Sequence, residues 1–229
     1  MTALELLAEL EALGTEQNRK IYRRHAADPN YDTYGVSFAN LYALQKRIRT
    51  DHALALALWP TGKADARIMA LFIADPAQGD AALLDRWAAD VADYGLADAF
   101  GGYAVRTAGG VKQALEWIKD KREFVQRCGW NTLSAAMKDG TDGLSDAQCA
   151  KLLGHIERHI HKAPNRAREG MNYALIAFGV YKPQLREAAL AAAGRIGKVD
   201  VDHGETGCKT RDATEYILKA VERRAKKAK

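Results

Sequence analysis

Apolar residues recur every three to four positions along nearly the whole chain, separated by short polar or glycine-containing gaps. This spacing places apolar side chains on one face of an α-helix. The first such stripe consists of Leu6, Leu7, Leu10 and Leu13, and Gly14 closes it. An Asn-Gly turn between alternating apolar residues, which is typical of a β-hairpin, does not occur. The pattern therefore predicts an all-α protein.

The same periodicity predicts where the other helices lie. They are expected at 15–27, 37–48, 51–58, 63–74, 80–92, 95–107, 111–119, 122–138, 145–161, 165–179, 183–196 and 210–226. Four prolines, at positions 60, 76, 164 and 183, fall in gaps or at first helical positions. The missing proline N–H costs nothing there, so the prolines agree with these boundaries.

Similar helical segments recur along the chain. Those at 64–72, 123–133, 166–179 and 184–194 each carry an arginine near the start, followed by small apolar residues. Helix pairs that repeat at about 40 residues are typical of HEAT-type solenoids. We therefore predict an α-solenoid of HEAT-like antiparallel helix pairs, forming a single domain over 1–229. The first 35 or so residues would be capping helices.

Composition narrows the class further. The chain has 229 residues, of which 48% are hydrophobic, and this excludes disordered and fibrous proteins. Thirty-four Lys and Arg against 29 Asp and Glu give a net charge of +5, a mild excess that suits a nucleic-acid partner.

The start of the sequence and the cysteines indicate the cellular compartment. The opening MTALELLAELEAL lacks the basic region of a secretory signal, and the apolar stretches are too short to cross a bilayer. The three cysteines are widely spaced and form no CxxC pair. We expect a cytoplasmic protein of the bacterial cytosol or nucleoid, with no membrane partner and no disulfide framework.

The segment 93–107 places a carboxylate beside aromatic rings. On a helix, Leu96, Phe100 and Tyr103 share an inward face, while Tyr94 and Asp98 lie one turn apart on another face. Asp98 is thus a candidate site residue. The alternative is a solvated acid near a helix start, where negative charge is common.

Two later helices also carry polar faces. In 165–179, Arg166, Gly170 and Tyr173 lie beside the core stripe, and in 122–138 Arg127 and Asn131 form part of a polar strip. Such a strip suits phosphate oxygens. A tyrosine at a helix–helix contact and an exposed arginine without function are the alternatives.

Three stretches in their order carry a resemblance. YGLAD (94–98), VQRCGW (125–130) and EGMNYALIAFG (169–179) look like parts of the DNA alkylation repair proteins, the AlkD-like DNA glycosylases built from HEAT-like repeats. VDHGETGCKTRDATEYILKA (201–220) resembles the closing segment of bacterial members. The resemblance runs from about Val36 onward.

The resemblance implies a site and a function. The family's cleft acid falls on Asp98, its two aromatic positions on Tyr94 and Tyr173, and its backbone-contacting arginine on Arg127. Tyrosines stand where the best-studied members have tryptophans. The implied activity is hydrolysis of the N-glycosidic bond of cationic N3- or N7-alkylated purines in duplex DNA, as in base excision repair. The resemblance also implies that the lesion is not buried by base flipping.

The chemistry supports a lone carboxylate for such a substrate. A cationic base leaves with little protonation, and positive charge then develops on the sugar. A carboxylate about 4 Å away stabilises that charge by roughly 4 kcal/mol at an effective dielectric constant of 20. This corresponds to about three powers of ten in rate. Asp98 can also orient the attacking water as a general base.

Basic and amide side chains near helix starts are the candidates for phosphate contacts. These DNA-binding candidates are Arg67, Arg127, Asn131, Asn165, Arg166, Lys209 and Arg211. Thr210 is the expected cap of the last helix. Each cation taken singly is also consistent with an ordinary solvated surface residue.

Histidines and cysteines give weaker signals. His155 and His159 lie one helical turn apart, near His161, but no third ligand is evident and no metal or other cofactor is expected. In DHGETGCKT, we expect His203 to order the loop and Cys208 to be packed, rather than the two forming a nucleophile pair.

Three functions remain open at this point. The preferred one is excision of alkylated purines by a monomer bound to duplex DNA. The others are noncatalytic binding of unusual DNA structures on the same scaffold, and a protein-interaction scaffold. A shared fold does not separate them.

Overall fold

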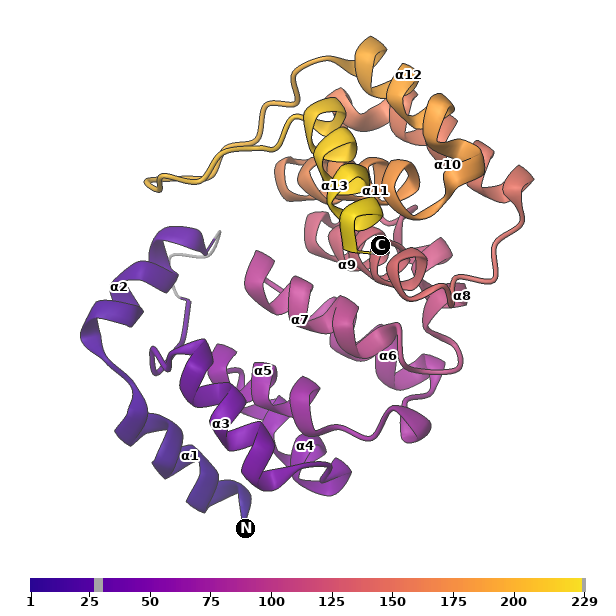
Figure 1. The fold of residues 1–229 in the computed structure, drawn as a ribbon. Coiled ribbons are helices and arrows are strands. Elements are labelled where there is room, and N and C mark those ends of the chain that lie inside the picture. The colour runs from indigo at the N-terminus through magenta and orange to yellow at the C-terminus, as the bar shows by residue number, and fades with distance from the viewer. Residues whose placement is uncertain (27–30, 228–229) are drawn as a thin grey trace. The chain divides into compact units, whose positions relative to one another are not determined.

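A computed structural model describes residues 1–26 and 31–227, apart from the side chain of His25 (Figure 1). Within these residues the secondary structure consists of thirteen α-helices, four short 3₁₀ helices and one isolated bridge, with no β-strand. The all-α prediction is confirmed. The chain forms two compact units, Met1–Gln113 with Gly204–Thr206, and Ala114–His203 with Gly207–Lys229.

The first unit contains seven complete helices within the described residues. They are α1 (Ala3–Leu13), α2 (Glu16–His25), α3 (Phe38–Ile48), α4 (His52–Leu58), α5 (Ala64–Ile73), α6 (Ala81–Ala89) and α7 (Tyr94–Ala104). Side-chain caps explain most of the starts. Thr2 and Glu5 form a capping box on α1, and Ser37, Asp51 and Asp80 cap α3, α4 and α6.

Helix α5 lies at the centre of this unit. It packs against α3, α4 and α7, and eight of its ten residues are buried. Trp59 and Trp87 add a stacked ring pair at 4.3 Å between centroids. Burial of large aromatic and aliphatic side chains on both sides of α5 supplies most of the driving force for folding this unit.

The second unit contains the later helices. They are α9 (Glu123–Asp139), α10 (Asp146–His159), α11 (Asn165–Tyr181), α12 (Arg186–Ile196) and α13 (Ala213–Lys227), and α8 (Gly110–Trp117) crosses the boundary between the units. Helix α11 packs against α9, α12 and α13 (Figure 1). Because it is surrounded in this way, thirteen of its seventeen residues are buried.

The predicted helices all occur, with differences at their ends. The segment 210–226 becomes a helix only at Ala213, because the Asp212 carboxylate, not the Thr210 hydroxyl, accepts from the N–H of Glu215 at 2.8 Å. The segment 183–196 begins with a 3₁₀ turn, Pro183–Leu185, before α12. The end of 15–27 lies outside the described residues. The prediction of a single domain stays a prediction.

Candidate functional site

The candidate site residues fall into two groups, one in each unit. Asp98 and Tyr94 lie on α7 of the first unit, whereas Arg127, Arg166 and Tyr173 lie on α9 and α11 of the second. Each group has a distinct local geometry.

Helix α7 is held by its cap and its inward face. Asp93 accepts a hydrogen bond from the N–H of Leu96 at 2.9 Å, which fixes the first turn. Leu96, Phe100 and Tyr103 are buried, as predicted. Tyr94 is half-buried and Asp98 is exposed on the remaining side of the helix.

Asp98 and Tyr94 both line a cavity of about 590 Å³ inside the first unit. This volume is within the range of small-molecule sites, about 300–1,000 Å³. The walls come from α2, α3, α5 and α7 together with the segment before α3. Rings dominate the lining, and they belong to Tyr22, Tyr31, Phe38, Tyr42, Phe72, Tyr94 and Tyr103. We call this space the aromatic cavity.

Two buried carboxylates at the aromatic cavity are bound to the protein itself. Asp65 accepts from the Thr33 hydroxyl and the Tyr34 N–H at 2.6 Å each, and from the Val36 N–H at 2.9 Å. These bonds fix the segment before α3. Asp93 is bound to the Tyr31 hydroxyl in addition to the cap.

Burial dominates the ionisation of the Asp93 and Tyr31 pair. It raises the pKa of Asp93 above the usual range, although the bonds from Leu96, Tyr31 and Gly95 act in the opposite direction. Burial, followed by the charges of Asp93 and Asp65, also raises the pKa of the Tyr31 hydroxyl. Tyr31 therefore remains a neutral donor to Asp93.

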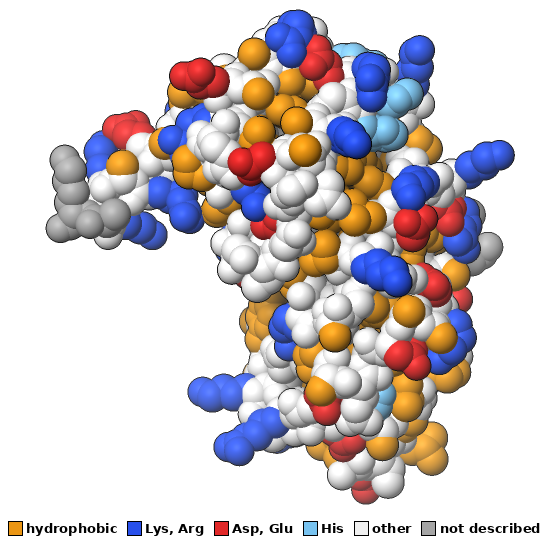
Figure 2. All heavy atoms as spheres, turned by 90° about the vertical axis from the view of Figure 1, so that its right-hand side faces the viewer, with side chains coloured by type: hydrophobic (Ala, Val, Ile, Leu, Met, Phe, Trp, Pro, Cys, Tyr) orange, Lys and Arg blue, Asp and Glu red, His pale blue; other side chains and the backbone are white. Residues whose placement is uncertain are grey.

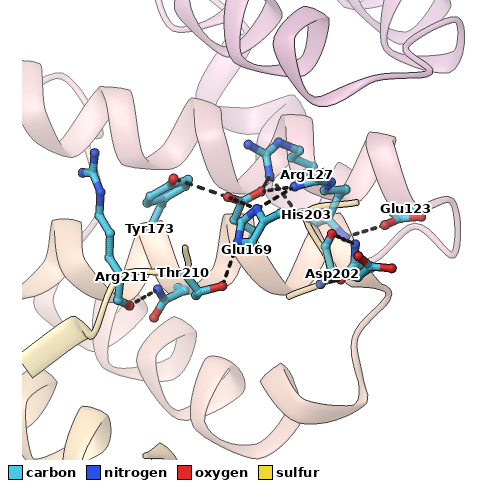
Figure 3. A network of polar contacts seen from close by, with 11 residues as sticks. Glu123, Arg127, Glu169, Tyr173, Asp202, His203, Thr210 and Arg211 are labelled. Atoms are coloured by element: carbon cyan, nitrogen blue, oxygen red, sulfur yellow. Dashed lines mark hydrogen bonds and ion pairs between the residues drawn. The ribbon is translucent and has the colours of Figure 1, made fainter. Parts of the chain in front are cut away.

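In the second unit, a buried ion network joins α9 to α11 (Figure 3). The Arg127 guanidinium donates to Glu169 Oε2 at 2.7 Å and to the Arg166 carbonyl at 3.2 Å. Arg166 Nη1 donates to the same Glu169 oxygen at 3.2 Å. Arg127 is 1% exposed, so its charge is balanced inside the protein. Gly170 permits this close packing, because a Cβ there would lie 3.2 Å from Trp130 Cβ.

Glu169 is the centre of this network. Burial alone would raise the pKa of its carboxyl, but Arg127, Arg166 and His203 outweigh burial and lower it. The Tyr173 hydroxyl also lies near, 3.4 Å from Glu169 Oε1. Glu169 therefore holds two arginines and a candidate aromatic residue in place.

The network extends to the segment between α12 and α13. Arg166 Nη1 contacts His203 Nδ1 at 3.2 Å, and His203 Nε2 contacts the Thr210 hydroxyl at 3.0 Å. Asn165 exchanges two hydrogen bonds of 2.7 Å with the backbone of Asp202. The segment is thereby fixed to the first turn of α11. The expected loop-ordering role of His203 is confirmed.

Several predicted phosphate contacts are engaged within the protein. Arg127 and Arg166 are buried in the Glu169 network, and Asn165 holds Asp202. Arg67 donates to the Trp59 and Asp90 carbonyls at 3.3 and 2.9 Å. A charged side chain can be buried when an oppositely charged or polar partner lies close to it. The spacing in the sequence did not reveal these partners.

Lys209 and Arg211 differ, since both are exposed. They line a hollow of about 390 Å³ bordered by residues of 197–212. The Arg211 guanidinium lies over the Tyr216 ring at 4.5 Å and over the Tyr173 ring at 5.6 Å. Asn131 on α9 is half-buried. On the face that Figure 2 shows, Lys and Arg side chains are dispersed among Asp and Glu rather than gathered in one patch.

The histidines and cysteines form no metal group in the described part of the chain. The His155 and His159 rings lie 4.5 Å apart between centroids at a tilt of 41°, and His155 also lies near the Trp130 ring. Cys208 is exposed, so the prediction that it is packed is wrong; it lies in a loop rather than on a helix face. No helix in the described ranges is long and apolar enough to cross a membrane.

Sequence reasoning missed Glu169 and Asp65 as organising residues. For Glu169 a signal existed, because it follows Arg166 by three positions on a helix whose other residues are largely apolar. Asp65 had no such signal, since its partners lie about thirty residues earlier.

Comparison with known proteins finds matches over nearly the whole chain. A family model described as DNA alkylation repair enzyme matches residues 6–217. The uncharacterized proteins Lin0241 of Listeria innocua and Lmo0209 of Listeria monocytogenes are each 28% identical over 220 residues, covering 94% of this chain and 96% of theirs.

A solved structure is similar over 97% of this chain and 95% of its own, with 28% identity and a TM-score of 0.86. It represents a new family of proteins related to the HEAT-like repeat DNA glycosylases, with affinity for branched DNA structures. The predicted HEAT-like helical fold is confirmed by this match.

Proposed function

Because this chain belongs to the DNA alkylation repair enzyme family, we propose that it binds DNA and that branched DNA is its preferred form. The observation that carries the proposal is the full-length similarity to a solved structure whose family has affinity for branched DNA. The tyrosines at positions 94 and 173 also favour binding over catalysis, because tyrosine stabilises a nearby cation less well than tryptophan.

The DNA contacts proposed from this structure are made mainly by the exposed cations. Lys209 and Arg211 are available to phosphate oxygens, and Asn131 is partly available. Arg127, Arg166 and Asn165 would support binding indirectly, by fixing the 197–212 segment that carries these two cations. Arg67 would have a similar positioning role in the first unit. Phosphate contacts of this kind bind DNA without reading its sequence.

Excision of cationic alkylated purines is the second candidate function. It is favoured by the position of Asp98, an exposed carboxylate beside Tyr94 at the wall of an open cavity. In this reaction the C1′–N bond breaks and its electron pair leaves with the base. Asp98 would stabilise the positive sugar, with the Tyr94 ring beside it on the same helix. Water then attacks C1′, and the Asp98 carboxylate accepts its proton as general base.

An electrophoretic mobility assay tests the preferred function. Wild-type protein is titrated into a four-way junction, a flap and a matched linear duplex at fixed salt. We expect tighter binding to the branched forms, with affinity falling as salt rises because counterions are released. Equal affinity for all three forms would contradict the preference, and no binding even at low salt would favour a protein-interaction scaffold.

Release of 7-methylguanine and 3-methyladenine from alkylated DNA tests the second function. The variants are Asp98→Asn and, as a matched control, Asp139→Asn at the exposed end of α9. If excision occurs through Asp98, its loss should lower the rate by about three powers of ten, while the control leaves it unchanged. Release that survives Asp98→Asn would remove Asp98 from the mechanism. No release by the wild type would contradict the second function.

A further inference from the structure

The lining of the aromatic cavity includes rings that the fold leaves partly exposed. Phe38 is 38% and Tyr42 is 54% exposed, although both lie on α3 beside an apolar core. The Tyr42 ring stacks on Phe72 at 5.2 Å with an interplanar angle of 15°, and Phe38 lies 6.1 Å from Tyr42. These three residues form a continuous aromatic edge. Phe38 is tilted by 46° to Tyr42, whereas the near-parallel Tyr42 and Phe72 rings offer flat faces on which a planar ligand can stack.

The lining of the aromatic cavity also includes a glycine that the fold does not require. A Cβ on Gly102 would meet no atom within 4 Å, and its backbone has no positive φ. Glycine inside a helix lowers the stability of that helix relative to alanine. The glycine nevertheless lines the aromatic cavity and leaves open space at its wall.

The charges around the aromatic cavity select the kind of ligand. Asp65, Asp93 and Asp98 line it with Arg106, which is exposed, so acidic groups outnumber basic ones. A phosphate group inside would therefore be repelled. Asp65 and Asp93 already accept hydrogen bonds from the protein, and the remaining surface is largely ring faces. This favours a planar ring over an anion.

We infer that the aromatic cavity binds an unpaired nucleobase, of the kind exposed at the branch point of branched DNA. The base would stack on the edge formed by Phe38, Tyr42 and Phe72, with its sugar and phosphate outside, on the side of Arg106. Stacking on aromatic side chains accepts every base, because each has a π-face. The inference rests on the proposed binding of branched DNA and assigns the part of that DNA which the first unit recognises.

The test uses a junction that carries 2-aminopurine at an unpaired branch position, since this base fluoresces less when it stacks. A second junction carries it at a paired position in one arm. Wild-type protein should lower the fluorescence of the branch-point base and leave the paired base unchanged. Binding of the same junctions is measured in parallel by electrophoretic mobility.

Two variants remove the site in different ways. Gly102→Leu adds a bulky side chain at the wall of the aromatic cavity, and Tyr42→Ala removes the central ring of the edge. As a control, Gly194→Leu places the same side chain in open space on α12. Both site variants should lose the fluorescence change and bind the junction about 5- to 150-fold more weakly, the loss expected for one stacked base. Affinity for linear duplex should be unchanged, and circular dichroism establishes that each variant is folded.

The outcomes separate this inference from the proposed function. If wild-type protein binds junctions in preference to duplex but the branch-point fluorescence does not change, the inference is wrong and the proposed function stands. The inference is also wrong if both site variants respond like the wild type. If the wild type shows no preference for junctions, the proposed function fails and the inference fails with it.

Discussion

Among single residues, Glu169 is the carboxylate that balances two buried arginines in the second unit. Its carboxylate faces two guanidinium groups, and its side chain is 8% exposed, as is consistent with a paired buried charge. A buried ion pair adds little when both members are present, because desolvation offsets the attraction. Removal of one member is costly, because the other charges remain buried without compensation.

We expect Glu169→Gln to lower the free energy of unfolding by about 3–5 kcal/mol. The substitution keeps the shape of the side chain and removes only its charge, so the loss reports the uncompensated arginines. The control is Glu157→Gln, which breaks an ion pair with Arg195 that is largely exposed. The control should change stability by less than about 1 kcal/mol. Urea unfolding followed by tryptophan fluorescence measures both, and equal effects would contradict the argument.

The lowered pKa of Glu169 predicts a pH dependence of this difference. A carboxyl whose pKa is lower in the folded state stabilises the protein above its ordinary pKa of 4.5, and that stability is lost as pH falls through the folded-state value. The gap between wild type and Glu169→Gln should therefore be largest near pH 7 and shrink below pH 4.5. Urea unfolding of both proteins across this range is the measurement. A gap that does not depend on pH would show that the charge is not the cause.

For Asp93 in the first unit, the raised pKa predicts a pH dependence of stability of the opposite sign. Burial raises its pKa, so its contribution to stability is present at low pH and is lost as pH rises through the folded-state value. Asn keeps an oxygen that can cap α7 and carries no charge. Asp93→Asn should therefore become more stable relative to wild type between pH 3 and pH 7. Thermal unfolding at both pH values tests this, and a relative loss of stability at pH 7 would contradict it.

At the scale of elements, small residues set how closely helices approach. Gly129 on α9 faces the end of α8, and a Cβ there would lie 2.8 Å from the Ile118 nitrogen and 2.9 Å from the Ala114 carbonyl oxygen. Both atoms belong to the backbone, so α9 would have to move. Gly194 on α12 faces open space instead.

This contrast predicts opposite effects of the same substitution. Gly129→Ala should lower the free energy of unfolding by about 1–3 kcal/mol, the usual cost of overpacking. Gly194→Ala should raise it by about 0.5–1 kcal/mol, because alanine is the better helix former and no clash opposes it. Denaturant unfolding of the two variants is sufficient. Stabilisation by Gly129→Ala would mean that α8 and α9 adapt at little cost.

At the scale of the whole molecule, the charge distribution sets how DNA is bound. The net charge of +5 is modest, and two arginines, Arg127 and Arg166, are paired inside the protein. The phosphate contacts available for DNA are therefore fewer than the total of basic residues suggests. Each contact contributes about 0.9 to the slope of log affinity against log salt.

We expect Lys209→Gln and Arg211→Gln each to weaken DNA binding and to reduce this slope by about one. The control is Lys151→Gln, which removes an exposed cation on α10 outside the 197–212 segment. Fluorescence anisotropy at several salt concentrations measures all three. An unchanged slope for both Lys209→Gln and Arg211→Gln would place the phosphate contacts elsewhere.

The sequence by itself was sufficient for the helices and for the inward face of α7. Caps such as Asp93, and the apolar stripe of Leu96, Phe100 and Tyr103, act within a few residues of the chain, so their pattern is local. The family could also be recognised from the sequence, because YGLAD and EGMNYALIAFG occur in their expected order along the chain. Only the helix ends differ from the prediction, as at Thr210, where the helix begins instead at Ala213.

Tertiary structure decided which charges reach solvent and where a cavity forms. Arg127 is buried because Glu169 lies beside it from 42 positions later, and no local spacing contains that information. The aromatic cavity likewise requires α2, α3, α5 and α7 together. Periodicity determines which face of a helix is apolar, whereas burial of a charge or a ring depends on what packs against it.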